Sequence, residues 1–97
     1  MNYIIEKTEI FDEWLKSLRD QRARMMVVRR MSRLESGNLG DVKTLGNGIS
    51  EIRIDTGVGY RVYYTIRDRR IVFLLNGGDK STQQTDIKRA IKLAKEV

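Results

Sequence analysis

Residue types that bind phosphate alternate with apolar residues between positions 50 and 80. Glu51 and Arg53 are two positions apart, and Arg61 and Tyr63 repeat this spacing in the next run. Side chains two residues apart lie on one face of a β-strand. The spacing therefore predicts a sheet with one apolar face and one charged face, and we expect any chemistry on the charged face.

Arg61 is the best candidate for a phosphate ligand on this face, because a planar guanidinium can hold a phosphate through two parallel hydrogen bonds. The alternative is a salt bridge across the hairpin to Glu51 or Asp55. Lys80, which follows the pair Gly77-Gly78, is either a second phosphate-binding cation or a solvated loop lysine.

The sequence contains no cysteine and no histidine, which limits the chemistry that it can perform. Disulfides, thiolate nucleophiles, histidine acid–base catalysis and the usual zinc sites are excluded. Catalysis would depend on Lys, Arg, Tyr, Ser, Thr or carboxylates, and we expect no cofactor and no metal.

An excess of basic residues indicates an anionic partner. The 97 residues include 19 Lys and Arg against 13 Asp and Glu, a formal net charge of +6, with a pI near 9.9. Such a surface suits nucleic acid or an acidic protein segment, or it only keeps the protein in solution. With no long apolar run and no export signal, we expect a globular cytoplasmic protein that does not enter membranes.

The first third of the chain has helical periodicity after a short strand. Residues 2–6 are β-prone, and Thr8 can cap a helix over about residues 9–19. Asp20 can then cap a second helix, which Gly37 would end in a left-handed conformation. The two helices are expected to form a hairpin.

The second of these helices carries a strongly basic face. Its arginines are Arg22, Arg24, Arg29, Arg30 and Arg33, and Glu35 is the acidic residue beside them. Three interpretations remain open for this face: a solvated surface, a contact with a phosphate backbone, and a docking surface for an acidic partner.

The pattern changes to short alternating runs after residue 38. Runs 42–45, 49–55 and 60–67 are predicted strands, and Gly46-Asn47-Gly48 is a strong turn signal between the first two. Residues 71–75 are apolar at every position, which predicts a central strand that is covered on both faces.

The pair Gly77-Gly78 is predicted to end the last strand, and Ser81 or Thr82 to cap a final helix. These elements predict one domain over residues 1–97 with an α+β, two-layer architecture. In it, an N-terminal strand and a helical hairpin pack on a mainly antiparallel sheet, with a C-terminal helix.

Two motifs and the order of elements carry a family resemblance. Gly59-Tyr60-Arg61-Val62-Tyr63-Tyr64, and the stretch from Leu74 to Gln83 that leads into a helix with Asp86-Ile87 and Ala90, resemble the RelE/ParE toxin superfamily. The branch that the chain resembles is that of the HigB-like and phage-derived addiction module killer proteins. The resemblance implies a RelE-like fold and the toxin of a type II toxin–antitoxin system, neutralised by a cognate helix-turn-helix antitoxin.

The resemblance allows more than one activity. RelE-like and HigB-like members cleave mRNA in the ribosomal A site, which would make the ribosome and mRNA partners and the protein a metal-independent endoribonuclease that inhibits translation. ParE-like members instead poison DNA gyrase. A third alternative is an inactive toxin that serves as a co-repressor with its antitoxin.

For RNA cleavage, the resemblance assigns roles to individual residues. Arg61 matches an arginine that stabilises the phosphate charge, and Arg53 corresponds to a RelE lysine after a turn that is one residue longer. Lys80 would be the second phosphate ligand or the general acid. The catalytic set is completed by the carboxylates of Glu51 and Asp79 as candidate bases.

The remaining predicted RNA contacts surround this set. They are Tyr63, which could stack on an RNA base or act as the general base itself, Asp86, which is a further candidate for the general base, and Arg67 and Arg89. RelE-like members have a tyrosine near the start of the last helix, where this chain reads Gln83-Gln84-Thr85-Asp86 without an aromatic residue. The identity of the general base therefore stays open at the level of sequence.

Overall fold

A computed structural model describes residues 2–97, which form a five-stranded sheet and three helices. In chain order the elements are β1 (Ile4–Lys7), α1 (Glu9–Ser17), α2 (Gln21–Glu35), β2 (Val42–Gly46), β3 (Ile49–Ile54), β4 (Tyr60–Arg67), β5 (Ile71–Asp79) and α3 (Gln83–Ala94), with a 3₁₀ turn at Lys80–Thr82 before α3. Within the described residues, no helix is long and apolar enough to cross a membrane.

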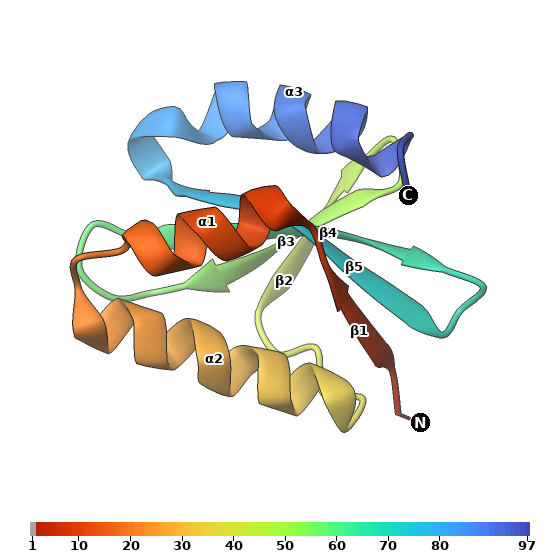
Figure 1. The fold of residues 1–97 in the computed structure, drawn as a ribbon, viewed down its shortest axis with the longest axis horizontal. Coiled ribbons are helices and arrows are strands. Elements are labelled where there is room, and N and C mark those ends of the chain that lie inside the picture. The colour runs from red at the N-terminus through yellow and green to blue at the C-terminus, as the bar shows by residue number, and fades with distance from the viewer. Residues whose placement is uncertain (1) are drawn as a thin grey trace.

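The sheet has the order β1-β5-β4-β3-β2. β1 runs parallel to β5, and each of the other neighbouring pairs is antiparallel. The structure thus confirms the predicted α+β class, with an N-terminal strand and a helical hairpin against a mainly antiparallel sheet (Figure 1).

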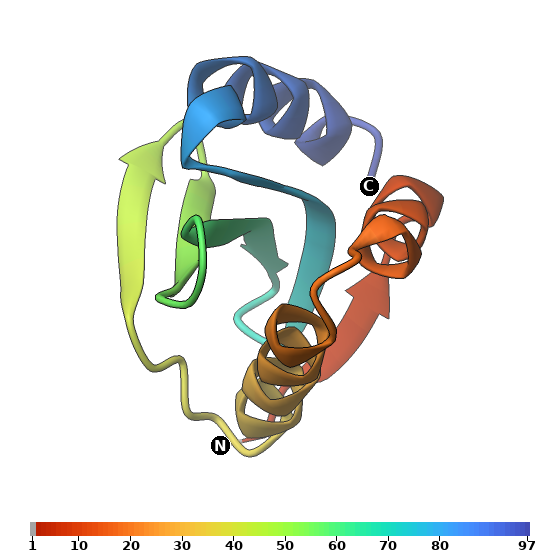
Figure 2. The ribbon, with the colours of Figure 1, turned by 90° about the vertical axis from the view of Figure 1, so that its left-hand side faces the viewer.

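The helices cover both faces of the sheet rather than one. α1 and α2 pack on one face through Phe11, Val27 and Leu34, whereas α3 packs on the other through Ala90 and Leu93. Figure 2 shows the curved sheet between α3 and α2, whereas α1 lies at the side of the sheet, where Ile10 also packs against the cluster beneath α3. The expectation of an open charged face is therefore wrong over most of its length, because the apolar side of α3 lies on it.

The predicted local signals at the helix ends are confirmed. The side chain of Thr8 accepts a hydrogen bond from the Phe11 amide, and that of Asp20 accepts one from the Ala23 amide. Gly37 has a φ of 88°, the left-handed conformation that ends α2.

The pair Gly77-Gly78 does not end the last strand as predicted. β5 continues through both residues to Asp79, paired with the start of β4. A side chain at Gly77 would overlap the ring of Trp14, and one at Gly78 would overlap the Asp86 carboxylate. The two glycines are needed for close approach of α1 and α3 to the strand, not for a turn.

Candidate functional site

A polar pocket lies where β3 ends and β4 begins. It has a volume of about 250 Å³, and its walls are Asp41, Arg53, Asp55, Gly57, Val58, Gly59, Arg61 and Lys80. The three cations that the sequence selected thus lie around one pocket.

Strand register and one backbone contact bring these cations together. Arg53 and Arg61 are direct partners in the antiparallel pairing of β3 with β4. The Lys80 amide donates to the Gly59 carbonyl at 3.1 Å, which ties the start of the 3₁₀ turn to the β3–β4 hairpin. Gly59 has a φ of +81°, and the Lys80 side chain passes over it. The hairpin turn therefore sets the position of all three cations.

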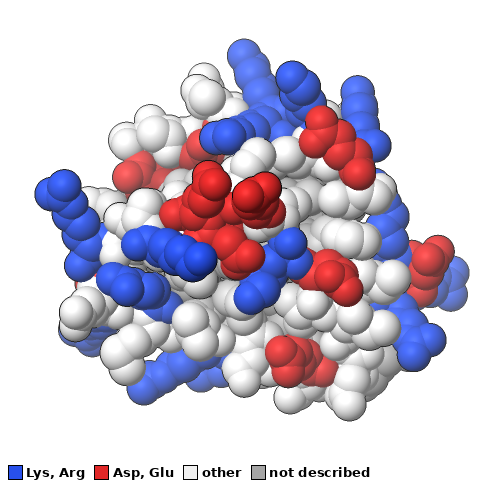
Figure 3. Space-filling model, in the orientation of Figure 1, with Lys and Arg blue, Asp and Glu red and all other residues white. Residues whose placement is uncertain are grey.

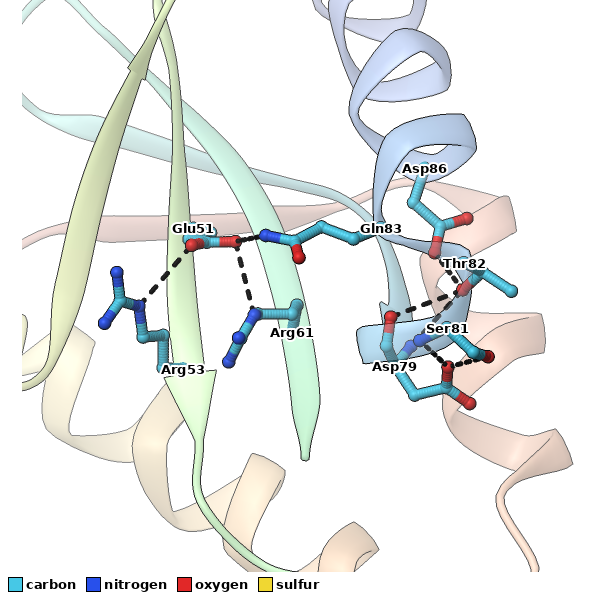
Figure 4. A network of polar contacts seen from close by, with 8 residues as sticks. All are labelled: Glu51, Arg53, Arg61, Asp79, Ser81, Thr82, Gln83 and Asp86. Atoms are coloured by element: carbon cyan, nitrogen blue, oxygen red, sulfur yellow. Dashed lines mark hydrogen bonds and ion pairs between the residues drawn. The ribbon is translucent and has the colours of Figure 1, made fainter. Parts of the chain in front are cut away.

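Glu51 lies behind the two arginines. Its side chain is 1% exposed, and its carboxylate is 3.4 Å from Arg53 Nε and 3.5 Å from Arg61 Nε. Gln83, the first residue of α3, donates to the same carboxylate at 3.3 Å (Figure 4). The salt bridge considered for Arg61 is thus present with Glu51, and within the described part of the chain it does not involve Asp55.

Tyr63 is not available to RNA in this structure. Its side chain is 0% exposed and belongs to the cluster beneath α3. Burial, with the nearby Glu51 carboxylate, raises the pKa of the Tyr63 phenol far above its ordinary value. The predicted stacking role is wrong, because no ring face is exposed, and the neutral phenol is a poor base.

Asp79 and Asp86 form a second polar network beside the pocket. Asp79 accepts hydrogen bonds from the Ser81 amide at 2.8 Å and the Ser81 hydroxyl at 2.5 Å, and these bonds lower the pKa of its carboxyl. Thr82 donates its hydroxyl to Asp86 at 2.5 Å. The sequence predicts Ser81 or Thr82 as the cap of the final helix. Thr82 does lie at the N-cap position of α3, but its side chain makes no capping bond there, and it is Asp79 that caps the preceding 3₁₀ turn.

The other two predicted RNA contacts lie away from the pocket. Arg67 ends β4 and donates to the Ala94 carbonyl at 2.6 Å, so it anchors the end of α3. Arg89 is exposed on α3 and lines a separate recess with Ile10, Lys92 and Leu93. The structure brings together Arg53, Arg61, Lys80 and Glu51, and it does not bring Arg67 or Arg89 to them.

Comparison with known proteins now places the chain. A family model described as phage derived protein Gp49-like (DUF891) matches residues 13–97. The chain belongs to this family. An uncharacterized protein of Haemophilus influenzae is 48% identical over 97 residues, which is all of this chain and 98% of the relative.

Two solved structures share the fold of this Gp49-like protein. A mutant of the E. coli toxin RelE in the free state matches 95% of this chain and 97% of its own, with a TM-score of 0.75 and 22% identity. The toxin–antitoxin complex RelBE2 from Mycobacterium tuberculosis contains a chain matched over 82% of this protein and 100% of that chain, with a TM-score of 0.66 and 25% identity. The predicted membership of the RelE-like superfamily is confirmed, and the HigB-like branch stays a prediction.

Two residues of this site in the Gp49-like protein are not predicted from the sequence. Asp41 precedes β2 and reaches the pocket because β2 pairs with β3, and its carbonyl accepts from the Arg53 amide at 3.0 Å. Gln83 reaches Glu51 from α3. The alternating pattern along β3 could have pointed to Asp41 once strand pairing was assumed, whereas nothing local marks Gln83.

Two of the five α2 arginines have structural partners. Arg30 donates to the carbonyls of Arg53, Leu39 and Asp41 at 2.8–3.1 Å, and burial lowers the pKa of its guanidinium. Arg24 donates to the Leu18 carbonyl at 2.8 Å. The basic face that remains exposed on α2 consists of Arg22, Arg29 and Arg33.

Proposed function

We propose that this Gp49-like protein is the toxin of a type II toxin–antitoxin system and that it cleaves mRNA on the ribosome. The RelE-like fold and the RelBE2 toxin–antitoxin complex among its structural neighbours support the first part. The observation that carries the second part is the pocket, in which Arg53, Arg61 and Lys80 surround a space large enough for a phosphate.

In this proposal the three cations stabilise the negative charge that develops during the reaction. The 2'-hydroxyl attacks the adjacent phosphorus, and the bond to the 5'-oxygen of the next nucleotide breaks. Arg53 and Arg61 stabilise the charge that develops on the phosphate oxygens, and Lys80 protonates the leaving oxygen or binds the phosphate. Alignment of the mRNA by the ribosome can itself lower such a barrier by about 7–11 kcal/mol.

We assign the general base to one of the two carboxylates that line the pocket, Asp41 or Asp55. Both are exposed beside the cations. The other candidates make different contacts. Glu51 is buried against two arginines, and Tyr63 is covered. Asp79 caps a turn, and Asp86 accepts a hydrogen bond from Thr82 outside the pocket. An Asp41→Asn or Asp55→Asn variant should lose the acidic limb of the pH–rate profile, in which the rate falls because a carboxylate base becomes protonated.

Purified protein with programmed ribosomes tests the proposal. We expect cleavage of the mRNA in the A site, read by primer extension, and loss of cleavage in Arg61→Ala by about 100-fold or more. Arg70→Ala, which removes an exposed arginine in the turn between β4 and β5, at the opposite end of β4 from Arg61, is the matched control. Intact mRNA together with inhibited DNA supercoiling by gyrase would contradict the proposal and support the ParE-like alternative.

The same proposal implies a neutralising partner. We expect a helix-turn-helix protein encoded beside this gene to co-purify with the toxin and to abolish cleavage. Arg61→Ala should still bind it, because a catalytic substitution need not disturb the neutralising contact. If the purified complex of the two proteins still cleaves mRNA on the ribosome at the full rate, the antitoxin assignment is contradicted.

A further inference from the structure

We infer that Glu51 is a positioning residue that holds Arg53 and Arg61 by their Nε atoms, so that the outer ends of both guanidinium groups serve the same phosphate. The inference deepens the proposed function, since it concerns the same pocket. Its first two readouts, however, are independent of RNA cleavage.

The placement of Glu51 differs from that of an ordinary surface acid. Its side chain is 1% exposed in the middle of β3, opposite the buried Tyr63. One carboxylate oxygen faces Arg53 and the other faces Arg61, and Gln83 donates to the second oxygen. A carboxylate that is removed from water is stable only with such partners.

The two arginines need this carboxylate because they are direct neighbours across the strands. Arg53 and Arg61 are paired in the β3–β4 register. Like charges at opposed positions of an antiparallel pair repel and destabilise it. In Figure 4 the Glu51 carboxylate makes an ion pair with each arginine, and its negative charge compensates this repulsion.

The atoms used by Glu51 leave the phosphate-binding part of each arginine free. Both ion pairs involve Nε, and the terminal nitrogens point away from Glu51 (Figure 4). At 3.4 and 3.5 Å these are ion pairs rather than short hydrogen bonds, and neither Nε has a hydrogen-bond partner among residues 2–97. A guanidinium that is held in this way can still offer its terminal N–H groups to a phosphate.

Glu51→Gln separates positioning from simple charge. The substitution removes a negative charge beside the pocket, so charge alone predicts tighter binding of inorganic phosphate. Positioning predicts weaker binding, because the two guanidinium groups lose their common anchor. Glu35→Gln, at an exposed acidic residue of α2, makes the same change of net charge elsewhere and is the matched control.

The first two measurements use the isolated protein. In ¹H–¹⁵N spectra, the Nε–H signals of Arg53 and Arg61 should shift and broaden in Glu51→Gln and stay unchanged in Glu35→Gln. Titration with inorganic phosphate should then show weaker binding to the first variant only. Unchanged Nε–H signals, or tighter phosphate binding in Glu51→Gln, would overturn the inference even if the toxin cleaves mRNA as proposed.

Cleavage on programmed ribosomes provides the third measurement. We expect kcat to fall by about 100-fold in Glu51→Gln with a much smaller change in KM, since misplaced groups are felt in the transition state. If wild-type protein does not cleave mRNA, the proposed function fails while the spectra still decide the role of Glu51.

A second variant covers the case in which Glu51→Gln does not fold. Gln83→Ala removes the third contact to the carboxylate at the partly exposed start of α3, where it is far less disruptive. It should shift the Arg61 Nε–H signal more than that of Arg53, because Gln83 and Arg61 share one carboxylate oxygen. Equal or absent shifts in this variant would contradict the arrangement.

Discussion

Arg61 has less freedom than the arginine beside it. Its side chain is 13% exposed, whereas that of Arg53 is 37% exposed, although both pair with the same carboxylate. A restrained guanidinium loses less conformational entropy when it binds a ligand. Arg61 is therefore suited to fix the position of a phosphate, and Arg53 to adjust to it.

Gly77 matters for stability because of the side chain that packs against it. The Trp14 ring occupies the place of its missing side chain. We expect Gly77→Ala to lower the free energy of unfolding by about 1–3 kcal/mol, because the ring and β5 must move apart. Urea unfolding monitored by Trp14 fluorescence measures the change.

Trp14→Leu is the control for this explanation. When position 14 carries the smaller leucine, Gly77→Ala should lower the free energy of unfolding clearly less than it does in the wild type. A double-mutant cycle gives the coupling energy between the two positions. Equal costs in both backgrounds would show that the backbone conformation of β5, not the ring, disfavours a side chain at position 77.

At the scale of elements, much of the fold could be predicted because its signals are local. Thr8 and Asp20 mark the helix starts by capping, and Asn47-Gly48 marks the first hairpin with two positive φ values. The hydrogen bonds that decide such features lie within a few residues, so the sequence pattern contains the required information.

The errors concern contacts between elements that are distant in sequence. Tyr63 and Glu51 have the alternation of an exposed face, yet α3 covers them. The charged site could be predicted as far as Arg53, Arg61 and Lys80. Strand spacing selected the two arginines, whereas Lys80 was selected by its place after Gly77-Gly78 and by the resemblance to RelE-like proteins. The contribution of Gln83 could not, because it depends on where the first turn of α3 packs.

The 3₁₀ turn that precedes α3 has a pH-dependent cap. Hydrogen bonds from Ser81 lower the pKa of the Asp79 carboxyl below its ordinary value of about 3.9. A lowered folded-state pKa means that the ionised cap stabilises the fold fully above the unfolded-state pKa. This contribution disappears as the pH falls through the folded-state pKa.

Asp79→Asn tests this cap, because it keeps an acceptor oxygen and removes the charge. The variant should be less stable than the wild type at neutral pH, and the difference should shrink at pH values below about 3.9. Urea unfolding over a pH series measures it, and direct titration of Asp79 by NMR gives the pKa. A stability difference that does not change with pH would contradict an ionised cap.

At the scale of the whole molecule, the net charge of +6 is unevenly placed. Figure 3 shows acidic side chains gathered in the middle of one face, over α1, which carries Glu9, Asp12 and Glu13, and basic side chains along α3 at the top of the view. The exposed basic residues within α3 are Lys88, Arg89 and Lys92. The acidic area on α1 would repel RNA, so we expect α3 rather than α1 to face it.

Salt dependence of ribosome binding tests this orientation. Each neutralised phosphate adds about 0.7–0.9 to the slope of log affinity against log salt concentration. Arg89→Gln should reduce the slope by about that amount while leaving cleavage at saturating ribosome little changed. Arg69→Gln, in the exposed turn between β4 and β5, serves as the control. An unchanged slope for Arg89→Gln would remove α3 from the interface.

The parallel pairing of β1 with β5 has a consequence for the order in which the chain can fold during synthesis. Ile4 pairs with Ile71, and the Thr8 hydroxyl bonds to the Leu75 carbonyl across 67 positions of sequence. β3 and β4 need only a short loop to meet, whereas β1 must wait on the ribosome until β5 has emerged. α1 and α2 wait with it, since they pack on the same strands. The polar pocket between β3 and β4 therefore gains its rigid support only when almost the whole chain has left the ribosome that makes it.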